Sequence, residues 1–173
     1  MGPDAMARSL SDLDETTDWY VERLRDRLRS HVGDRLVSLV LYGSRARGTH
    51  RNDSDIDVLI VIDGLSPDRA GRHALLRPIK QTVDGEHARE RGRPAPHLAY
   101  IVKTPDEAAH HAPLYLDMTE DAILVWDRDG FFGGVLEGLR RRMAELGSRR
   151  VWLGEGWYWI LKPDMRWGER VEL

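Results

Sequence analysis

The stretch Leu41-Tyr42-Gly43-Ser44-Arg45-Ala46-Arg47-Gly48, followed by Ser54-Asp55-Ile56-Asp57-Val58-Leu59-Ile60-Val61, decides the fold of this chain. Each half lies against an apolar run that is typical of a strand, and a polar loop separates the two. Two carboxylates two residues apart on a strand point to the same face of the sheet. A small Gly-Ser turn lets a triphosphate approach the backbone. The stretch therefore predicts a site for a divalent cation and a nucleoside triphosphate.

Apolar periodicity outside this stretch predicts helices and strands in alternation. We expect helices over residues 10–31, 44–47, 67–91, 113–121 and 131–146, with a short one after Thr104, and strands over 35–42, 55–62, 97–102 and 122–126. Either Asp12 or Asp14 is a suitable cap for the first helix, and Glu107 completes a capping box with Thr104. This order of elements favours an α/β fold.

The tail of the chain is rich in aromatic residues: Trp152, Trp157, Tyr158, Trp159 and Trp167. Gly154-Glu155-Gly156 predicts a turn between two short strands, so we expect a hairpin. The favoured interpretation is that the hairpin buries its indoles on the sheet. The alternative is a protein-interaction surface, because Trp and Tyr are enriched among the residues that anchor interfaces.

The size and charge of the chain narrow its class. Its 173 residues fit one domain, with a core over about 10–146 and an aromatic tail over 147–173. The formal net charge of -3 lacks the basic excess of most nucleic-acid binders, which argues against a nucleic-acid partner. The absence of cysteine excludes disulfides and cysteine-ligated zinc.

The distribution of apolar residues argues against a membrane partner. No apolar run approaches the ~20 residues that a membrane-spanning helix needs. The stretch Met1–Ser11 is polar and lacks the apolar segment of a secretory signal. We therefore expect a cytoplasmic protein.

Two familiar motifs fail on inspection. Counted from Asp53, an EF-hand needs Gly at its sixth position and Glu at its twelfth, where this chain has Val58 and Gly64. A P-loop needs Lys after its second glycine, and here that residue is Thr49. A dinucleotide-binding Gly-x-Gly-x-x-Gly is absent as well. These exclusions leave a different class of nucleotide site.

The stretch resembles the signature of the DNA polymerase β-like nucleotidyltransferase superfamily. That signature is an apolar strand, Gly-Ser or Gly-Gly, about ten residues, and Asp-x-Asp in a second strand. Gly43-Ser44-Arg45-Ala46-Arg47-Gly48 with Ser54-Asp55-Ile56-Asp57 is most similar to the minimal nucleotidyltransferases of bacteria and archaea. The resemblance covers about residues 36–62. It implies a nucleotidyltransferase-type mixed sheet with helices packed against it, plus a C-terminal helix and an aromatic, hairpin-like tail.

The resemblance gives each motif residue a role. Asp55 and Asp57 are the expected catalytic residues and Mg²⁺ ligands, because Mg²⁺ prefers carboxylate, water and phosphate oxygens. Gly43 permits the tight turn, and Ser44 with the neighbouring amides is expected to bind β- and γ-phosphate oxygens. The two arginines are expected to add phosphate contacts, with an ion pair as the alternative for each: Arg45 and Arg47.

One departure from the superfamily concerns catalysis. Active members carry a third carboxylate on a later strand, but the strand predicted at 97–102 contains no Asp or Glu. Asp84 and Glu86 are weak substitutes, and His97 is a candidate base, with a structural role as the more common alternative for a lone histidine. Asp117 becomes a site residue only if the fold brings it near Asp57. Binding of Mg-nucleotide is therefore better supported than turnover.

The function implied is transfer of a nucleoside monophosphate, most plausibly AMP from ATP, to a hydroxyl of a protein or a small molecule. Many minimal nucleotidyltransferases are antitoxins paired with a small helical HEPN toxin, so such a partner, as a separate chain, is expected. Two alternatives remain. One is a degenerate nucleotide-binding or antitoxin module that acts by binding, and the other is an aminoglycoside nucleotidyltransferase. The missing third carboxylate favours the former of these two.

Overall fold

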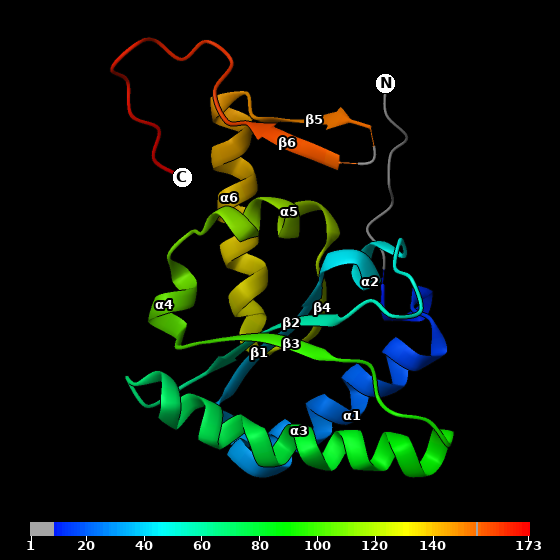
Figure 1. Ribbon diagram of the computed structural model, residues 1–173. Helices are drawn as coiled ribbons and strands as arrows, with labels where there is room; N and C mark the ends of the chain where they lie inside the picture. Colours follow the sequence, from blue (N-terminus) through cyan, green and yellow to red (C-terminus); the bar gives the residue numbers. More distant parts are fainter. Residues whose placement is uncertain (1–8, 155) are drawn as a thin grey trace.

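A computed structural model describes residues 9–154 and 156–173 (Figure 1). Its helices are α1 (Glu15–Val32), α2 (Gly43–Arg47), α3 (Arg69–Arg91), α4 (Pro105–Ala109), α5 (Pro113–Asp121) and α6 (Phe131–Leu146), with 3-10 turns at Leu10–Asp12, Gly33–Arg35 and Arg128–Gly130. Its strands are β1 (Leu36–Tyr42), β2 (Ile56–Ile62), β3 (Leu98–Lys103), β4 (Ile123–Asp127), β5 (Arg149–Leu153) and β6 (Gly156–Ile160). The predicted α/β class is confirmed.

The main sheet is mixed, as predicted, and has the strand order β3-β2-β1-β4. Strand β1 runs antiparallel to both β2 and β4, while β2 and β3 are parallel. In this register Tyr42, the last residue of β1, pairs with Asp57 of β2, and Asp57 in turn faces Ala99 of β3. The Gly-Ser turn at the end of β1 and the Asp-x-Asp motif at the start of β2 therefore lie side by side at one end of the two central strands.

Helices cover both faces of the sheet (Figure 1). Helices α1 and α3 lie on one face, where they pack against Leu39, Leu41, Val58 and Ile60. Helices α4, α5 and α6 lie on the other face, against Val37, Val40, Leu59 and Val61. Alternate residues of β1 and β2 thus enter different cores, which explains why both strands are almost continuously apolar.

The predicted first helix is interrupted near its start. Asp12 closes a 3-10 turn with Ser9, and Leu13 is extended. Asp14 then caps α1, accepting hydrogen bonds from the backbone N–H groups of Thr16 and Thr17 at 3.2 and 3.1 Å. The prediction of one helix over 10–31 is wrong in this respect, because Asp12 belongs to the capping box of the 3-10 turn that Ser9 starts, whereas Asp14 caps a separate helix. The capping box of Thr104 and Glu107 is confirmed at α4.

The aromatic tail forms the expected hairpin, with Trp152 paired to Trp157. The prediction that the hairpin buries its indoles on the main sheet is wrong. Strands β5 and β6 form a separate two-stranded sheet beyond α5 (Figure 1). Helices α5 and α6 already cover that face, so the hairpin packs at the α5 end. Trp152 is 60% exposed, and Trp167 is fully exposed. Glu155 of the expected turn and residues 1–8 of the polar N-terminal stretch lie outside the described residues.

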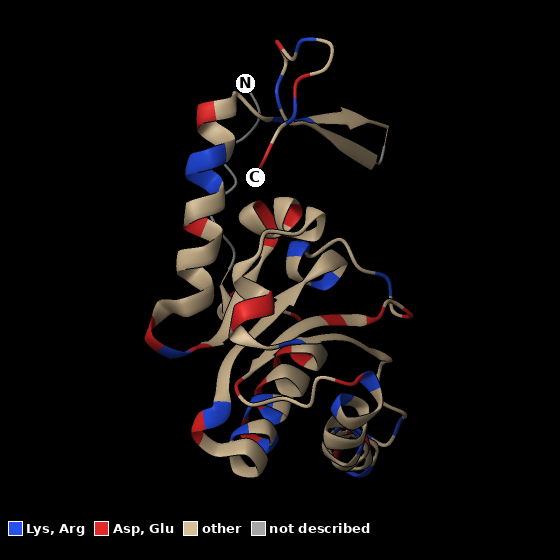
Figure 2. Cartoon of the chain, turned by 90° about the vertical axis from the view of Figure 1, so that its left-hand side faces the viewer, with Lys and Arg blue, Asp and Glu red and all other residues tan. Residues whose placement is uncertain are grey.

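Charged residues concentrate on the helices and loops (Figure 2). The two central strands, β1 and β2, carry a single charged side chain, Asp57. Asp57 is half-buried near the start of β2, and burial of a carboxylate costs free energy unless a partner compensates it, which makes Asp57 a candidate functional residue. None of the helices in the described ranges has the length and apolar character needed to cross a membrane.

Candidate active site

The backbone of Gly43 lies directly against the side chain of Asp57. Gly43 has a φ of +75°, and a Cβ added there would lie only 2.4 Å from Oδ2 of Asp57. Any other residue would both strain the backbone and collide with the carboxylate. The glycine therefore lets the turn after β1 lie directly against the functional strand.

The two carboxylates of Asp-x-Asp influence each other. Asp55 lies just before β2 and its side chain is half exposed, whereas Asp57 is on the strand itself. Burial, together with the charge of Asp55, raises the pKa of Asp57 above its ordinary value, and the charges of Arg47 and Arg45 only partly offset this. The local excess of negative charge is one that a cation would relieve.

This donor set fits Mg²⁺, which proteins usually hold through one or two carboxylates together with substrate phosphates. Asp55 and Asp57 are the residues that would hold it. Over residues 9–154 and 156–173, no group of three His, Cys, Asp or Glu side chains is placed to hold a metal ion. A cation bound here would therefore have two carboxylate ligands from the protein and would need its remaining ligands from water or a bound phosphate.

The strand expected to carry a third carboxylate, β3, carries none. Ala99 of β3 stands opposite Asp57. At the start of β3, Nδ1 of His97 lies 3.3 Å from Oδ2 of Asp55. The backbone carbonyl of His97 also accepts a hydrogen bond from the N–H of Ile56 at 2.8 Å. His97 is thus held beside the Asp-x-Asp pair.

The two weak substitutes lie elsewhere. Asp84 is on α3, where it accepts a hydrogen bond from the Tyr20 hydroxyl at 2.7 Å and pairs with Lys80. Glu86, also on α3, pairs with arginines of α1. Both carboxylates join α3 to its neighbours and do not take part in the site.

Arg45 lies inside the protein and not on the phosphate side. It is 3% exposed, and its Nη2 donates to the Ser54 carbonyl at 2.8 Å while Nη1 donates to the Thr17 hydroxyl at 2.9 Å. Nη1 is also 3.6 Å from Asp14. The expected phosphate contact is corrected here to the structural ion pair, because these protein acceptors engage the guanidinium. Arg45 fixes the loop that ends at Asp55.

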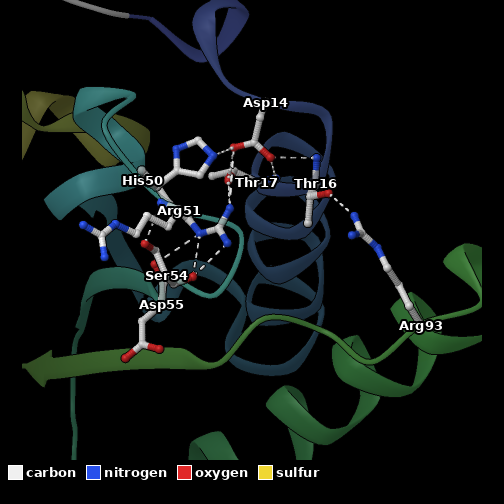
Figure 3. A network of polar contacts seen from close by, with 9 residues as sticks. Asp14, Thr16, Thr17, His50, Arg51, Ser54, Asp55 and Arg93 are labelled. Atoms are coloured by element: carbon white, nitrogen blue, oxygen red, sulfur yellow. Dashed lines mark hydrogen bonds and ion pairs between the residues drawn. The ribbon is translucent and has the colours of Figure 1, made fainter.

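Figure 3 shows the polar network into which this loop is tied, with Asp14 at its centre and Asp55 at its edge. Nε2 of His50 lies 3.2 Å from Asp14. Burial would raise the pKa of Asp14, but hydrogen bonds from Thr17 and the charges of His50 and Arg45 lower it overall. A polar cavity of about 320 Å³ borders the network and extends to His97. Asp53 and Ser54, the two residues that precede Asp55, are among the residues that line this cavity.

The remaining motif residues lie around the turn. Ser44 is half-buried in the first turn of α2, and its carbonyl accepts the Thr49 N–H at 3.0 Å. Arg47 lies at the end of α2, with Nη1 3.6 Å from Oδ2 of Asp121. Its guanidinium is 4.7 Å from the centre of the Trp157 ring. Unlike Arg45, Arg47 borders a cavity that it shares with Asp57.

That second cavity, of about 220 Å³, brings in residues from the C-terminal part of the chain. Asp117 lines it together with Asp57, so the condition on which Asp117 was a site candidate is met. Oδ1 of Asp117 accepts the indole N–H groups of Trp157 and Trp159 at 2.7 and 2.8 Å. The sequence did not predict Asp121 or Trp157 here.

Two sequence signals could have found these residues. Asp117 and Asp121 are four residues apart, which places them on one face of a helix. Trp157 and Trp159 alternate on a strand and therefore point to the same side. Neither pattern says which surface it faces, because that depends on contacts distant in sequence.

Comparison with known proteins identifies the family of the chain. A family model described as "Nucleotidyltransferase domain" matches residues 21–108, just over half of the 173 residues. The chain is also similar to the "Putative protein adenylyltransferase MJ1305" of Methanocaldococcus jannaschii. The identity is 28% over 122 residues, which cover 69% of this chain and 78% of that relative.

Solved structures also match parts of the chain, at low identity. A chain of a toxin-antitoxin crystal structure with AMP-PNP has a TM-score of 0.47 and 16% identity, covering 73% of this chain and 92% of that one. A "putative nucleotidyltransferase from Sulfolobus solfataricus" has a TM-score of 0.43 and 23% identity, covering 66% of this chain and 82% of that one.

Proposed function

The chain belongs to the nucleotidyltransferase domain family and is an enzyme of the nucleotidyltransferase class, and on this premise we propose that it transfers AMP from ATP to a hydroxyl group of a protein. The acceptor hydroxyl oxygen attacks the α-phosphorus and loses its proton to solvent, the bond from this phosphorus to the oxygen that bridges the α- and β-phosphates breaks, and pyrophosphate leaves. The proposed site consists of Gly43, Ser44, Asp55 and Asp57, with Arg47 at its border.

The observation that carries this proposal is the contact between Gly43 and Asp57. The absence of a side chain at Gly43 lets the Gly-Ser turn lie directly against the Asp57 carboxylate, which brings the proposed phosphate-binding turn and the proposed metal ligand together. Asp55 adds a second carboxylate, and burial together with the charge of Asp55 raises the pKa of Asp57. A bound Mg²⁺ would supply charge neutralisation at the α-phosphate and on the leaving pyrophosphate.

The choice of AMP and of a protein acceptor rests on different support. The archaeal relative is named as a protein adenylyltransferase and matches over most of its length. The motif of this chain also resembles that of minimal nucleotidyltransferases, some of which act with a HEPN toxin. We therefore propose a HEPN-type protein, supplied as a separate chain, as the acceptor or binding partner.

A second candidate function is nucleotide-dependent binding of the partner without transfer. It is favoured by one observation: β3 has Ala99 opposite Asp57 and carries no carboxylate. In this case Asp55 and Asp57 would still bind Mg-nucleotide, and the partner would be inhibited by contact alone.

Label transfer from ATP separates the two functions. The protein is incubated with Mg²⁺, the product of the neighbouring reading frame, and ATP labelled at either the α- or the γ-phosphate. We expect the α-label, and not the γ-label, to appear on the partner. Asp57→Asn should abolish transfer, whereas Asp53→Asn, an exposed carboxylate of the same loop, should leave it intact.

Each alternative outcome has a distinct meaning. Tight partner binding without transfer would support the second candidate. Transfer of the γ-label would identify a kinase and contradict the proposal. Labelling of an aminoglycoside by the isolated chain would restore the drug-modifying alternative.

A further inference from the structure

We infer that the C-terminal hairpin completes the nucleotide site and that the indole of Trp157 is the surface against which the nucleobase packs. This inference rests on the proposed function and adds to it a base-binding subsite. It also assigns the aromatic tail a role in nucleotide binding by the nucleotidyltransferase domain.

The cavity of about 220 Å³ combines two kinds of lining. The polar part comes from the sequence motif: Gly43, Arg47 and Asp57. The apolar part comes from α5 and the hairpin: Leu114, Met118 and Trp157. A nucleotide is divided in the same way, with anionic phosphates at one end and a flat, largely apolar base at the other. The cavity therefore places an apolar surface beside the proposed phosphate and metal residues.

Size and charge indicate which part of the nucleotide enters. Small-molecule sites usually measure about 300–1,000 Å³, so this cavity accommodates one moiety and not a whole nucleotide. Asp117 and Asp121 line it in addition to Asp57. Asp117 and Asp121 disfavour a phosphate group in the part of the cavity that α5 lines, whereas a neutral base carries no charge to repel. The base is thus the moiety that suits the cavity.

Trp157 is held in one orientation. Its Nε1 donates to Oδ1 of Asp117 at 2.7 Å, and the same oxygen accepts the Trp159 N–H. Asp121 links the hairpin to the motif as well, because its Oδ2 lies 3.3 Å from Arg150 of β5 and 3.6 Å from Arg47. An indole fixed before binding loses little conformational entropy when a base packs on it.

Arg47 connects the base subsite to the phosphates. Its guanidinium lies over the Trp157 ring, as flat cationic groups do on aromatic faces. A base that enters the cavity shares this space with Arg47 or displaces it. Arg47 and Asp57 line the same cavity, so the guanidinium is close to the residues proposed to bind the triphosphate.

The hairpin is a separate structural unit, which makes the inference testable. Strands β5 and β6 pair only with each other in the described residues, and they lie at the α5 end of the molecule (Figure 1). Substitution of Trp157 should therefore leave the main sheet folded. The fully exposed Trp167 provides a matched control.

The test measures the affinities of ATP and of inorganic tripolyphosphate, each with Mg²⁺, by titration calorimetry. Tripolyphosphate shares the phosphates of ATP and lacks the base. Trp157→Ala should weaken ATP about tenfold or more, the range found when an aromatic stacking partner is removed, and leave tripolyphosphate unchanged. Trp157→Phe, which keeps an aromatic ring, should retain most of the ATP affinity, and Trp167→Ala all of it.

The outcomes separate this inference from the proposed function. If ATP binds equally well to wild type and Trp157→Ala, the base subsite is wrong while the proposed function stands. If ATP and tripolyphosphate weaken together, Trp157 supports the site as a whole and does not hold the base. If neither ligand binds the wild-type protein, the proposed function fails and the subsite with it. Circular dichroism of each variant verifies that the fold is retained.

Discussion

Substitution of Gly43 by alanine tests the geometry of the site more selectively than removal of a carboxylate. Gly43 has a φ of +75°, and the new Cβ would lie 2.4 Å from Oδ2 and 3.1 Å from Cγ of Asp57. The backbone resists the change, and the carboxylate has to move. Gly43→Ala therefore displaces Asp57 without altering any charge.

The magnitude follows from two contributions. An L-residue held in the left-handed region costs about 1–2 kcal/mol. Forcing an added methyl group against packed atoms typically costs a further ~1–3 kcal/mol. Gly92→Ala is the matched control, because Gly92 has a φ of +64° but nothing lies within 4 Å of the added Cβ. The two variants should thus differ by the collision alone, about 1–3 kcal/mol of unfolding free energy.

Urea unfolding of both variants measures this difference, and calorimetric titration with Mg-ATP measures its effect on the site. We expect Gly43→Ala to lose at least ~10-fold in affinity, equivalent to about 1.4 kcal/mol, and Gly92→Ala to bind as wild type does. A folded Gly43→Ala variant that binds Mg-ATP normally would refute the assignment of this turn to the nucleotide site.

Three further predictions follow from single side chains. Ser44→Ala should weaken triphosphate binding by roughly 1–2 kcal/mol, the loss of one hydrogen bond to a charged group, as measured with tripolyphosphate. Because the pKa of Asp57 is raised in the folded state, stability should fall as pH rises through that pKa, so Asp57→Asn should stabilise the metal-free protein in urea unfolding with EDTA. Hydrogen bonds from Arg72, followed by one from the Thr104 backbone, lower the pKa of Glu107 to about 2. The stability that Glu107 contributes should be lost as pH falls from about 4.5 to about 2. Glu107→Gln should remove this pH dependence. Its cost at pH 7 should be under ~1 kcal/mol, because Glu107 of the Arg72–Glu107 ion pair is exposed to solvent.

Local sequence was sufficient to predict the two strands that carry Gly43-Ser44 and Asp55-Ile56-Asp57. The apolar runs on either side of Gly43-Ser44 and Asp55-Ile56-Asp57 predicted β1 and β2 within one residue of their observed bounds. Short-range rules also gave the capping box at Thr104, because cap and helix are adjacent in sequence. These features depend on neighbours along the chain, which a sequence pattern contains.

The errors involve contacts between distant segments. Whether Arg45 faces phosphate or protein depends on Thr17, 28 residues away, which α1 brings beneath it. The place of the aromatic hairpin depends on α5 and α6 covering the sheet first, so its indoles meet Asp117 and not the strands. Periodicity shows which side chains share a face but does not identify the partner of that face.

Titration of Mg-ATP into wild type, the double variant Asp55→Asn/Asp57→Asn, and Asp53→Asn tests the central claim most directly. The substitutions in both variants fall within the same short segment, residues 53–57. Only the double variant lacks the pair of carboxylates proposed to hold the metal. We predict binding that requires Mg²⁺ and is lost with EDTA, is lost in the double variant, and is unchanged in Asp53→Asn. Equal affinity for Mg-ATP in the folded double variant would contradict the assignment of Asp55 and Asp57 to the nucleotidyltransferase site.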